Sequence, residues 1–188
     1  QNTLIAFNKM HEAALQDGID IKIVSGFRDF ERQMLIWNNK YKKYTTEYRL
    51  SPTKAIEEII RFSTIPGTSR HHWGTDFDIY DASAMPENYQ IQLSPEEVQG
   101  NGLFAPMHDW LDEYIDTQQT DFFRPYEVDR GGIAPERWHL SYRPVAEQYA
   151  QMLTNDILSA KLKSSNLMLL DVVLEHLDEI FQRYIIVD

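Results

Sequence analysis

The chain of 188 residues contains no cysteine. Disulfides, cysteine-based zinc clusters and a cysteine nucleophile are therefore excluded. Basic side chains are also scarce, because 18 Lys and Arg stand against 29 Asp and Glu, which gives a net charge of -11. A surface this negative repels phosphate backbones, so we expect neither a nucleic-acid partner nor docking on anionic lipid.

Long apolar runs are missing too, since none reaches the ~18 residues that a membrane-spanning helix requires. No signal peptide is visible, and the chain begins at Gln1 rather than at a methionine. We therefore expect a trimmed or mature piece from which any export signal has been lost. The composition, with 43% hydrophobic residues, is typical of a globular protein, and the length favours one domain with a buried core.

Helix-type and strand-type patterns follow one another without regular βαβ alternation. Helices are predicted over 2–17, 29–43, 51–62, from Ser94-Pro95 and over 106–116, with Phe30, Met34, Leu35 and Trp37 facing inward in the second. Strands are predicted at 19–24, 77–80 and 138–142, and a loop or hairpin at 126–133. After Pro144 the chain is predicted to be helical to its end, in two segments.

These patterns predict an α+β fold, in which a small antiparallel sheet carries the candidate site and is flanked by helices. Residues 1–143 are expected to form the core. Residues 144–188 are expected to form a C-terminal helical segment that is packed on, or appended to, the same domain.

Two short segments hold most of the chemically useful side chains. Six residues separate His71 from Asp78, and His139 follows Glu136 by three positions. Two imidazoles and one carboxylate would leave a fourth position open for water at a zinc ion, with Glu136 as a base beside it. Gly74 allows the tight turn that would bring His71 and Asp78 together.

Three blocks, taken in order, resemble the VanY-type D-alanyl-D-alanine carboxypeptidases. This family belongs to a wider group with the lysostaphin-like peptidases and the zinc domain of hedgehog proteins. The blocks span residues 25 to 142, and together they are far more specific than any one alone. They are Ser25-Gly26-Phe27-Arg28 with Gln33; Pro66-Gly67-Thr68-Ser69-Arg70-His71 with Gly74 and Asp78; and Glu136-Arg137-Trp138-His139 with Tyr142.

The resemblance implies a zinc enzyme that removes the terminal D-alanine from peptidoglycan stem peptides, in the cell envelope or periplasm. It implies that zinc activates the attacking water, that Glu136 is the general base, and that Arg28 polarises the scissile carbonyl or holds a substrate carboxylate. The implied Zn²⁺ ligands are His71, Asp78 and His139. The implied substrate-binding residues are Ser25, Gln33, Ser69, Trp138 and Tyr142.

Three alternatives to this function stay open, as do the effects of two departures from the family pattern. The same residues could serve an L,D-carboxypeptidase or a peptidoglycan endopeptidase, or a zinc module that binds peptide without cutting it. Arg137 stands where the family often has proline, and Asp76 where it often has a small residue. On a strand Asp76 would share a face with Asp78, so it could be a ligand itself or support one. His72 is interpreted as pocket lining or surface, and His11, His108 and His176 are not expected to bind metal.

Overall fold

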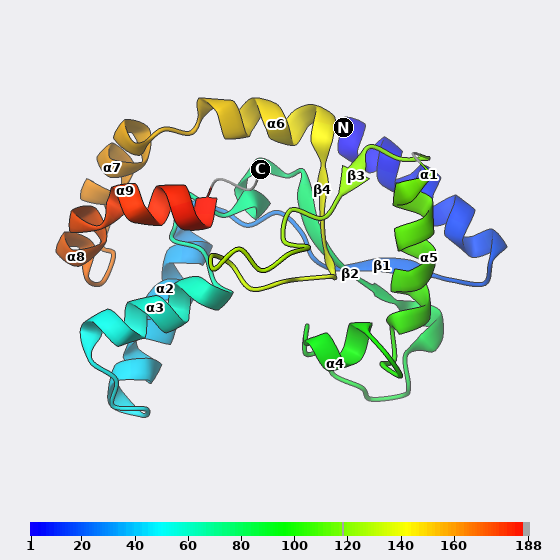
Figure 1. Cartoon of the computed structure of the whole chain (residues 1–188), viewed down its shortest axis with the longest axis horizontal. Helices are drawn as coiled ribbons and strands as arrows, with labels where there is room; N and C mark the ends of the chain where they lie inside the picture. The colour runs from blue at the N-terminus through cyan, green and yellow to red at the C-terminus, as the bar shows by residue number, and fades with distance from the viewer. Residues whose placement is uncertain (118, 186–188) are drawn as a thin grey trace. The chain divides into compact units, whose positions relative to one another are not determined.

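An antiparallel sheet of four strands lies in the first of two compact units (Figure 1). The computed structural model describes residues 1–117 and 119–185. The first unit comprises 1–27, 74–127 and 136–147, and the second comprises 28–73, 128–135 and the chain from 148 onward. The domain boundary expected between 143 and 144 stays a prediction.

The sheet has the strand order β1-β2-β4-β3, and each neighbouring pair is antiparallel. The strands are β1 (Ile21–Ser25), β2 (Asp76–Asp81), β3 (Phe122–Phe123) and β4 (His139–Tyr142). The α+β class with a small antiparallel sheet is confirmed. Strand β3 was not predicted, because two residues are too few to show an alternating pattern.

The two faces of the sheet differ in chemistry, because successive side chains of a strand point to opposite sides. Phe77 and Ile79 of β2 and Leu140 of β4 belong to the apolar core. Helices α1 (Asn2–Gln16) and α5 (Ala105–Asp116) cover this face, as Figure 1 shows. They contribute Phe7, Met10, Ala14, Met107, Leu111 and Tyr114 to the same core. The opposite face of β2 and β4 is therefore free to carry polar side chains.

An irregularity in β1 changes which of its residues face that polar side. Ile23 pairs with Ile79, but the next pair along the strand joins Ser25, not Val24, to Asp78. A bulge of this kind inserts one residue and re-aims the side chain that follows it. The strict alternation expected for this strand is broken here, and both Ile23 and Val24 are exposed, at 42% and 41%.

The predicted helix starts at Ser51 and Ser94 are confirmed. Ser51 accepts a hydrogen bond from the amide of Lys54 at the start of α3 (Pro52–Phe62). Ser94 and Glu97 form a capping box at α4 (Pro95–Val98). In each case a side-chain oxygen satisfies an amide that the first helical turn leaves unpaired.

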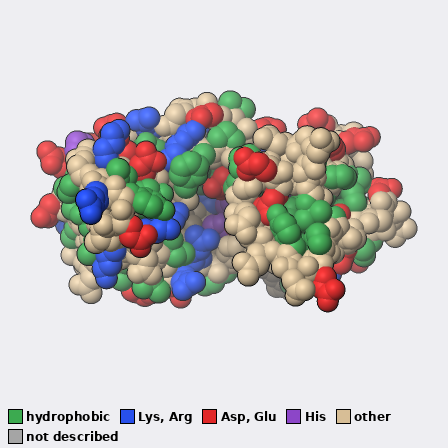
Figure 2. All heavy atoms as spheres, turned by 90° about the horizontal axis from the view of Figure 1, so that it is seen from below, with side chains coloured by type: hydrophobic (Ala, Val, Ile, Leu, Met, Phe, Trp, Pro, Cys, Tyr) green, Lys and Arg blue, Asp and Glu red, His purple; other side chains and the backbone are tan. Residues whose placement is uncertain are grey.

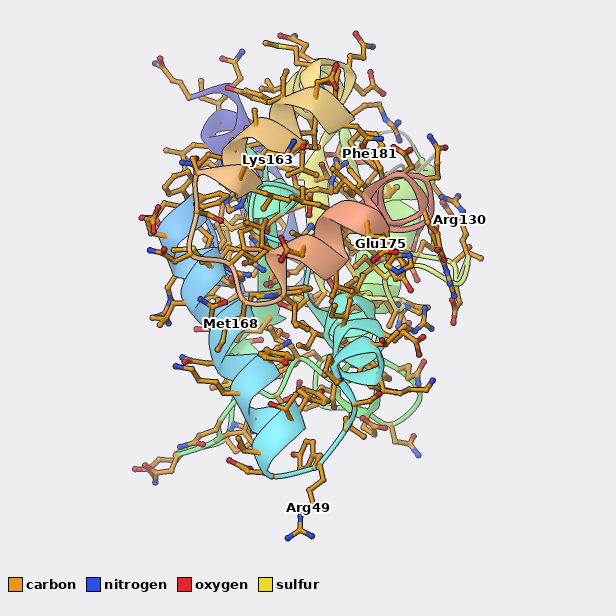
Figure 3. The ribbon with its side chains drawn as sticks, turned by 90° about the vertical axis from the view of Figure 1, so that its left-hand side faces the viewer. Arg49, Arg130, Lys163, Met168, Glu175 and Phe181 are labelled. Atoms are coloured by element: carbon orange, nitrogen blue, oxygen red, sulfur yellow. The ribbon has the colours of Figure 1, made fainter. Side chains whose placement is uncertain are left out.

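The second unit is built around α2 (Phe30–Thr46), α3 and the C-terminal helices. Trp37 of α2 is fully buried, and its indole donates to the carbonyl of Met168 at 3.2 Å. Asn38 accepts a hydrogen bond from the amide of Met168, which Figure 3 labels beside α2. The prediction that Leu35 faces inward is wrong, since it is 48% exposed.

The prediction of two helical segments after Pro144 is also wrong. The structure shows α6 (Arg143–Met152), α7 (Asn155–Lys163), α8 (Leu170–Glu175), α9 (Leu177–Ile180) and a final turn at Phe181–Ile185. Thr154 caps α7, and Leu169 before α8 has a φ of 61°, a left-handed backbone that interrupts the helical course. Local breaks of the backbone of this kind hardly change the spacing of apolar residues along the sequence, so the sequence does not predict them.

The two units differ in charge. The first contains 5 Lys and Arg against 17 Asp and Glu, whereas the second contains 13 against 12. The first unit thus holds -12 and the second +1, so the sheet-bearing unit accounts for the negative balance. Figure 2 shows basic side chains spread over the surface of the second unit.

Over residues 1–117 and 119–185, none of the helices combines the length and the apolar character needed to cross a membrane.

His108 of α5 is buried next to a cluster of charges. It is 0% exposed, its Nδ1 lies 3.4 Å from the Arg124 guanidinium, and its Nε2 finds no hydrogen-bond partner among the described residues. Burial, and then the charges of Arg124 and Arg137, lower the pKa of His108 from 6.5 to about 3. The ring is therefore neutral in the folded protein at all pH values above that.

We expect the free energy of unfolding to fall as the pH drops below 6.5, because His108 then binds a proton in the unfolded chain but not in the folded protein. At pH 5 this term is worth about 2 kcal/mol. Urea unfolding at pH 7 and pH 5, compared between wild type and His108→Gln, measures it. An equally steep loss in the variant would show that His108 is not the source.

Candidate metal centre

Two adjacent rows of side chains lie on the polar face of the sheet. Ser25 of β1, Asp78 of β2 and His139 of β4 are directly opposite one another in register. The next row places Asp76 opposite Ser141. Cross-strand neighbours of this type have Cβ atoms about 4.5–5.5 Å apart, so their side chains interact. The sheet alone thus brings together two residues that are 61 positions apart in sequence.

His139 lies between two carboxylates. Its Nδ1 is 3.0 Å from an Asp78 oxygen, and its Nε2 is 3.0 Å from an Asp76 oxygen. All three residues are buried, with 5% exposure or less. A buried carboxylate is costly unless hydrogen bonds compensate it, and the imidazole supplies one such bond to each acid.

Asp76 is further fixed by two hydroxyl groups. Its second oxygen accepts hydrogen bonds from Thr75 Oγ1 at 2.6 Å and from Ser141 Oγ at 3.0 Å. Ser141 and Thr75 are themselves buried. The carboxylate therefore has a defined orientation, with one oxygen directed to His139 and the other to the two hydroxyls.

The two acids also control the charge of the ring. Burial by itself lowers the pKa of His139, but the hydrogen bonds and charges of Asp76 and Asp78 raise it to about 10. The two carboxyl groups beside the ring thus favour its protonated form. A metal ion that binds a ring nitrogen takes the place of a proton there.

Glu136 lies at the turn that leads into β4. The amide of His139 donates to the Glu136 carbonyl, and the amide of Glu136 donates to the Tyr126 carbonyl. The Glu136 carboxylate, with 19% of its side chain exposed, is 3.8 Å from Nδ1 of His139. It thus lies on the Asp78 side of the ring, where solvent can reach it. Tyr126, which no sequence pattern singled out, is buried with its ring centre 5.0 Å from that of His139.

Arg137, which stands where the family often has proline, connects the turn at Glu136 to α5. Its guanidinium contacts Asp109 at 2.8 Å, pairs with Asp112, and donates to the carbonyl of Val98. Arg124 in turn donates to the Arg137 carbonyl at 2.9 Å. The backbone on the C-terminal side of Glu136 is therefore anchored by ionic and hydrogen-bonding contacts.

In the second unit His71 lies on a short 3₁₀ turn, Arg70–Trp73, and is buried. Its carbonyl accepts a hydrogen bond from the amide of Arg28 at 3.2 Å. Gly67 and Gly74 on either side have φ values of 93° and 67°. These are left-handed conformations that favour glycine, so the tight turn expected at Gly74 is present.

His72 connects two segments of this loop. The amide of Gly67 donates to Nε2 at 3.0 Å, and Nδ1 donates to the carbonyl of Arg28. Burial lowers the pKa of His72, which favours this neutral tautomer. The interpretation of His72 as pocket lining or surface did not include these two hydrogen bonds. Both partners are backbone atoms, which no pattern of side chains in the sequence reveals.

The Arg28 guanidinium is held by a buried amide. It donates to Gln33 Oε1 at 2.7 Å, and the Gln33 amide nitrogen donates to the carbonyl of Thr64 at 2.7 Å. Gln33 is 0% exposed. Gln33 therefore lies behind the Arg28 guanidinium and holds it through its amide oxygen.

The other predicted substrate contacts differ in their surroundings. Ser69 and Trp138 are buried, at 2% and 7% exposure. Tyr142 is half-buried and packs on Phe122, with the apolar core. Since Tyr142 is three positions beyond His139, strand alternation turns it to the other face of the sheet, and we do not carry it into the proposed site.

One donor atom from each of His71, Asp78 and His139 lies within 4.8 Å of the donor atoms of the other two. Two imidazole nitrogens and one carboxylate oxygen are the donor types that Zn²⁺ takes in catalytic sites, where three protein ligands leave one position open. The residues thus fit a metal ion in donor type and number.

Comparison with known proteins gives the family. The sequence profile of VanY, described as D-alanyl-D-alanine carboxypeptidase, matches residues 1–145. The chain belongs to the VanY family. An uncharacterised protein of Haemophilus influenzae is 35% identical to this VanY-family chain over 124 residues, which is 65% of the chain and 93% of that protein. A D-alanyl-D-alanine carboxypeptidase of Enterococcus faecalis is 29% identical over 137 residues, 71% of this chain and 44% of that protein.

Solved structures share the VanY fold. A variant of the vancomycin-resistance D,D-pentapeptidase VanY, in complex with Zn(II), has a TM-score of 0.57 at 23% identity, covering 78% of this chain and 75% of its own. VanYB in complex with D-alanine-D-alanine also gives 0.57 at 23% identity, with 88% and 82% covered. The LD-carboxypeptidase LdcB gives 0.55 at 21% identity, with 98% and 68% covered.

We expect His72→Ala to lower the free energy of unfolding by about 1–3 kcal/mol, because the Gly67 amide loses its acceptor and the Arg28 carbonyl loses a donor. His11→Ala is the matched control, since among the described residues the His11 ring contacts side chains rather than backbone groups: it bonds partly exposed Asp20 at 2.8 Å and stacks on Phe7. Its removal should cost about 0–1 kcal/mol. Urea titration measures both, and equal losses would contradict the role given to His72.

Proposed function

We propose that this VanY-family protein is a zinc-dependent carboxypeptidase that removes the terminal D-alanine from peptidoglycan stem peptides, and that it acts in the cell envelope. The observation that carries the proposal is the donor set His71, Asp78 and His139, with a separate carboxylate, Glu136, beside His139. Family membership supports the reaction. The Zn(II) and D-alanine-D-alanine complexes of structurally similar proteins support the metal and the substrate class.

A Zn²⁺ ion held by these ligands would supply Lewis acidity, which makes water a nucleophile near neutral pH and polarises a carbonyl. Glu136 is the general base in this proposal. Its carboxylate is partly exposed and lies on the Nδ1 side of His139, so it can take a proton from water and pass it to the leaving amine. The turn fixed by Arg137 and Tyr126 keeps it in place.

Arg28 is the proposed electrophilic group. Guanidinium stays charged and offers several donors in a rigid fork, which suits a carbonyl oxygen that gains charge, or the carboxylate at the end of a stem peptide. Gln33 holds it from behind. Ser25, in the strand row of Asp78, together with Ser69 and Trp138, remains a proposed contact to the peptide.

An L,D-carboxypeptidase is the competing activity, and one observation favours it: the LD-carboxypeptidase LdcB shares the fold over 98% of this chain. The family description favours the D,D activity. Stem tripeptide, tetrapeptide and pentapeptide, and a cross-linked dimer, should be incubated with zinc-loaded protein and the products weighed. Our proposal is supported if D-alanine is released from the pentapeptide and none of the other substrates is cleaved. Cleavage of the tetrapeptide supports the L,D activity. Cleavage of the cross-linked dimer supports an endopeptidase.

We expect Glu136→Ala to retain one zinc ion and to lower kcat for D-alanine release by about 10²–10⁴-fold, because the general base is lost while the proposed ligands stay. Zinc content and turnover on the pentapeptide measure the two effects. Glu147→Ala is the control, since Glu147 is exposed and, among the described residues, pairs only with Arg143.

Two outcomes would contradict this. Near wild-type turnover in Glu136→Ala would remove Glu136 from the mechanism. Bound zinc without turnover of any stem peptide by the wild type would instead favour a module that binds peptide without cutting it.

We expect Gln33→Leu to lower kcat/KM by about tenfold, because Arg28 loses the acceptor that orients it. In an Arg28→Ala background the same change should cost nothing further, since Gln33 acts through Arg28. Arg32→Ala, an exposed position on the same helix, is the control. Additive losses from the two changes would show that Gln33 acts independently of Arg28.

A further inference from the structure

The two nitrogens of His139 face different surroundings. Nδ1 has Asp78 at 3.0 Å and Glu136 at 3.8 Å, a proposed ligand and the proposed base. Nε2, on the other edge of the ring, has Asp76 at 3.0 Å. A ring nitrogen coordinates metal only in the direction of its lone pair, so the Nδ1 edge is the one that faces the proposed zinc position.

The distances agree with this division. Two donors on a tetrahedral zinc with bonds of 2.0–2.1 Å are about 3.3 Å apart. The separation of 3.0 Å between Nδ1 and the Asp78 oxygen is close to that value. Asp76 instead directs one oxygen to Nε2 and the other to the hydroxyls of Thr75 and Ser141.

We propose that Asp76 is a positioning residue for the metal centre and not one of its ligands, an inference that rests on the zinc site of the proposed function. By accepting the Nε2 proton, Asp76 fixes the tautomer of His139 that leaves the Nδ1 lone pair for the metal. A carboxylate in this place also makes the imidazole a stronger donor and holds its plane. Thr75 and Ser141 orient the carboxylate in turn.

The strand register supplies this arrangement. Asp76 and Asp78 are two positions apart on β2, so both point to the face that carries His139. One strand therefore presents a ligand and a support to the two edges of the same ring. A small residue at 76 would leave the Nε2 proton without this acceptor.

Zinc affinity, measured by competition with a chelating dye, tests the proposal in the purified full chain. Asp76→Ala should weaken zinc binding about 10–100-fold, which is the usual cost of losing such a partner. Asp76→Asn should weaken it less, because the amide oxygen still accepts the Nε2 proton.

Asp81→Asn is the matched control. Asp81 is a buried carboxylate on the same strand that accepts hydrogen bonds from the Asp20 amide and from Ser83. Its replacement should lower stability but leave zinc affinity unchanged.

A second readout separates positioning from general loss of structure. In zinc-loaded wild type, a long-range proton–nitrogen NMR spectrum of the imidazoles should show His139 with a slowly exchanging proton on Nε2. That proton should exchange with solvent much faster in Asp76→Ala. Should Asp76→Ala fail to fold, Asp76→Asn and Ser141→Ala carry both measurements, with smaller losses expected in the same direction.

The outcomes separate a failure of the role given to Asp76 from a failure of the proposed function. Unchanged zinc affinity and unchanged Nε2 exchange in Asp76→Ala would overturn the role of Asp76 and leave the proposed function intact. Equal losses above about 10³-fold in the alanine and asparagine variants, beyond the usual effect of a supporting partner, would make Asp76 a ligand and overturn the proposal. A wild type that binds no zinc would overturn both.

Discussion

The pairing of β2 with β4 is the constraint on which the candidate centre depends. It sets Asp78 opposite His139 and Asp76 opposite Ser141, on the face that the apolar core does not use. Because side chains alternate, a slip of one residue would turn these groups into the core and bring Phe77 and Leu140 to the polar face. The apolar contacts of α1 and α5 therefore also hold the polar groups in register on the opposite side of the sheet.

Burial of so many polar groups carries a cost in stability, which the network partly offsets. Asp76, Asp78 and His139 are nearly inaccessible, yet each has a partner of complementary charge or a hydroxyl donor. Removal of one member would leave its buried neighbours with fewer compensating bonds, which costs more stability than the net value of the pair. The same bonds that relieve this cost hold the imidazole in one orientation.

The sequence was informative where the signal is periodic or made of side chains. The α+β class, the capped starts at Ser51 and Ser94, and the strand that bears His139 follow from such signals. The breaks among the C-terminal helices, the bulge at Ser25 and the backbone partners of His72 do not, because each depends on local backbone geometry or on groups distant in sequence. The buried setting of Gln33 was missed for the same reason, since the contact with Thr64 joins residues 31 positions apart.

The bulge in β1 makes the length of this strand as important as its composition. Ile21 packs in the core whichever residue follows, but Ser25 reaches the row of Asp78 only because Val24 is an extra residue. Loss of Val24 would restore regular pairing with Ser25 still opposite Asp78, but the strand would lose the bend and the added twist that the bulge gives it just before Gly26-Phe27-Arg28. Substitutions at 23 and 24 should thus be tolerated far better than single-residue insertions or deletions there.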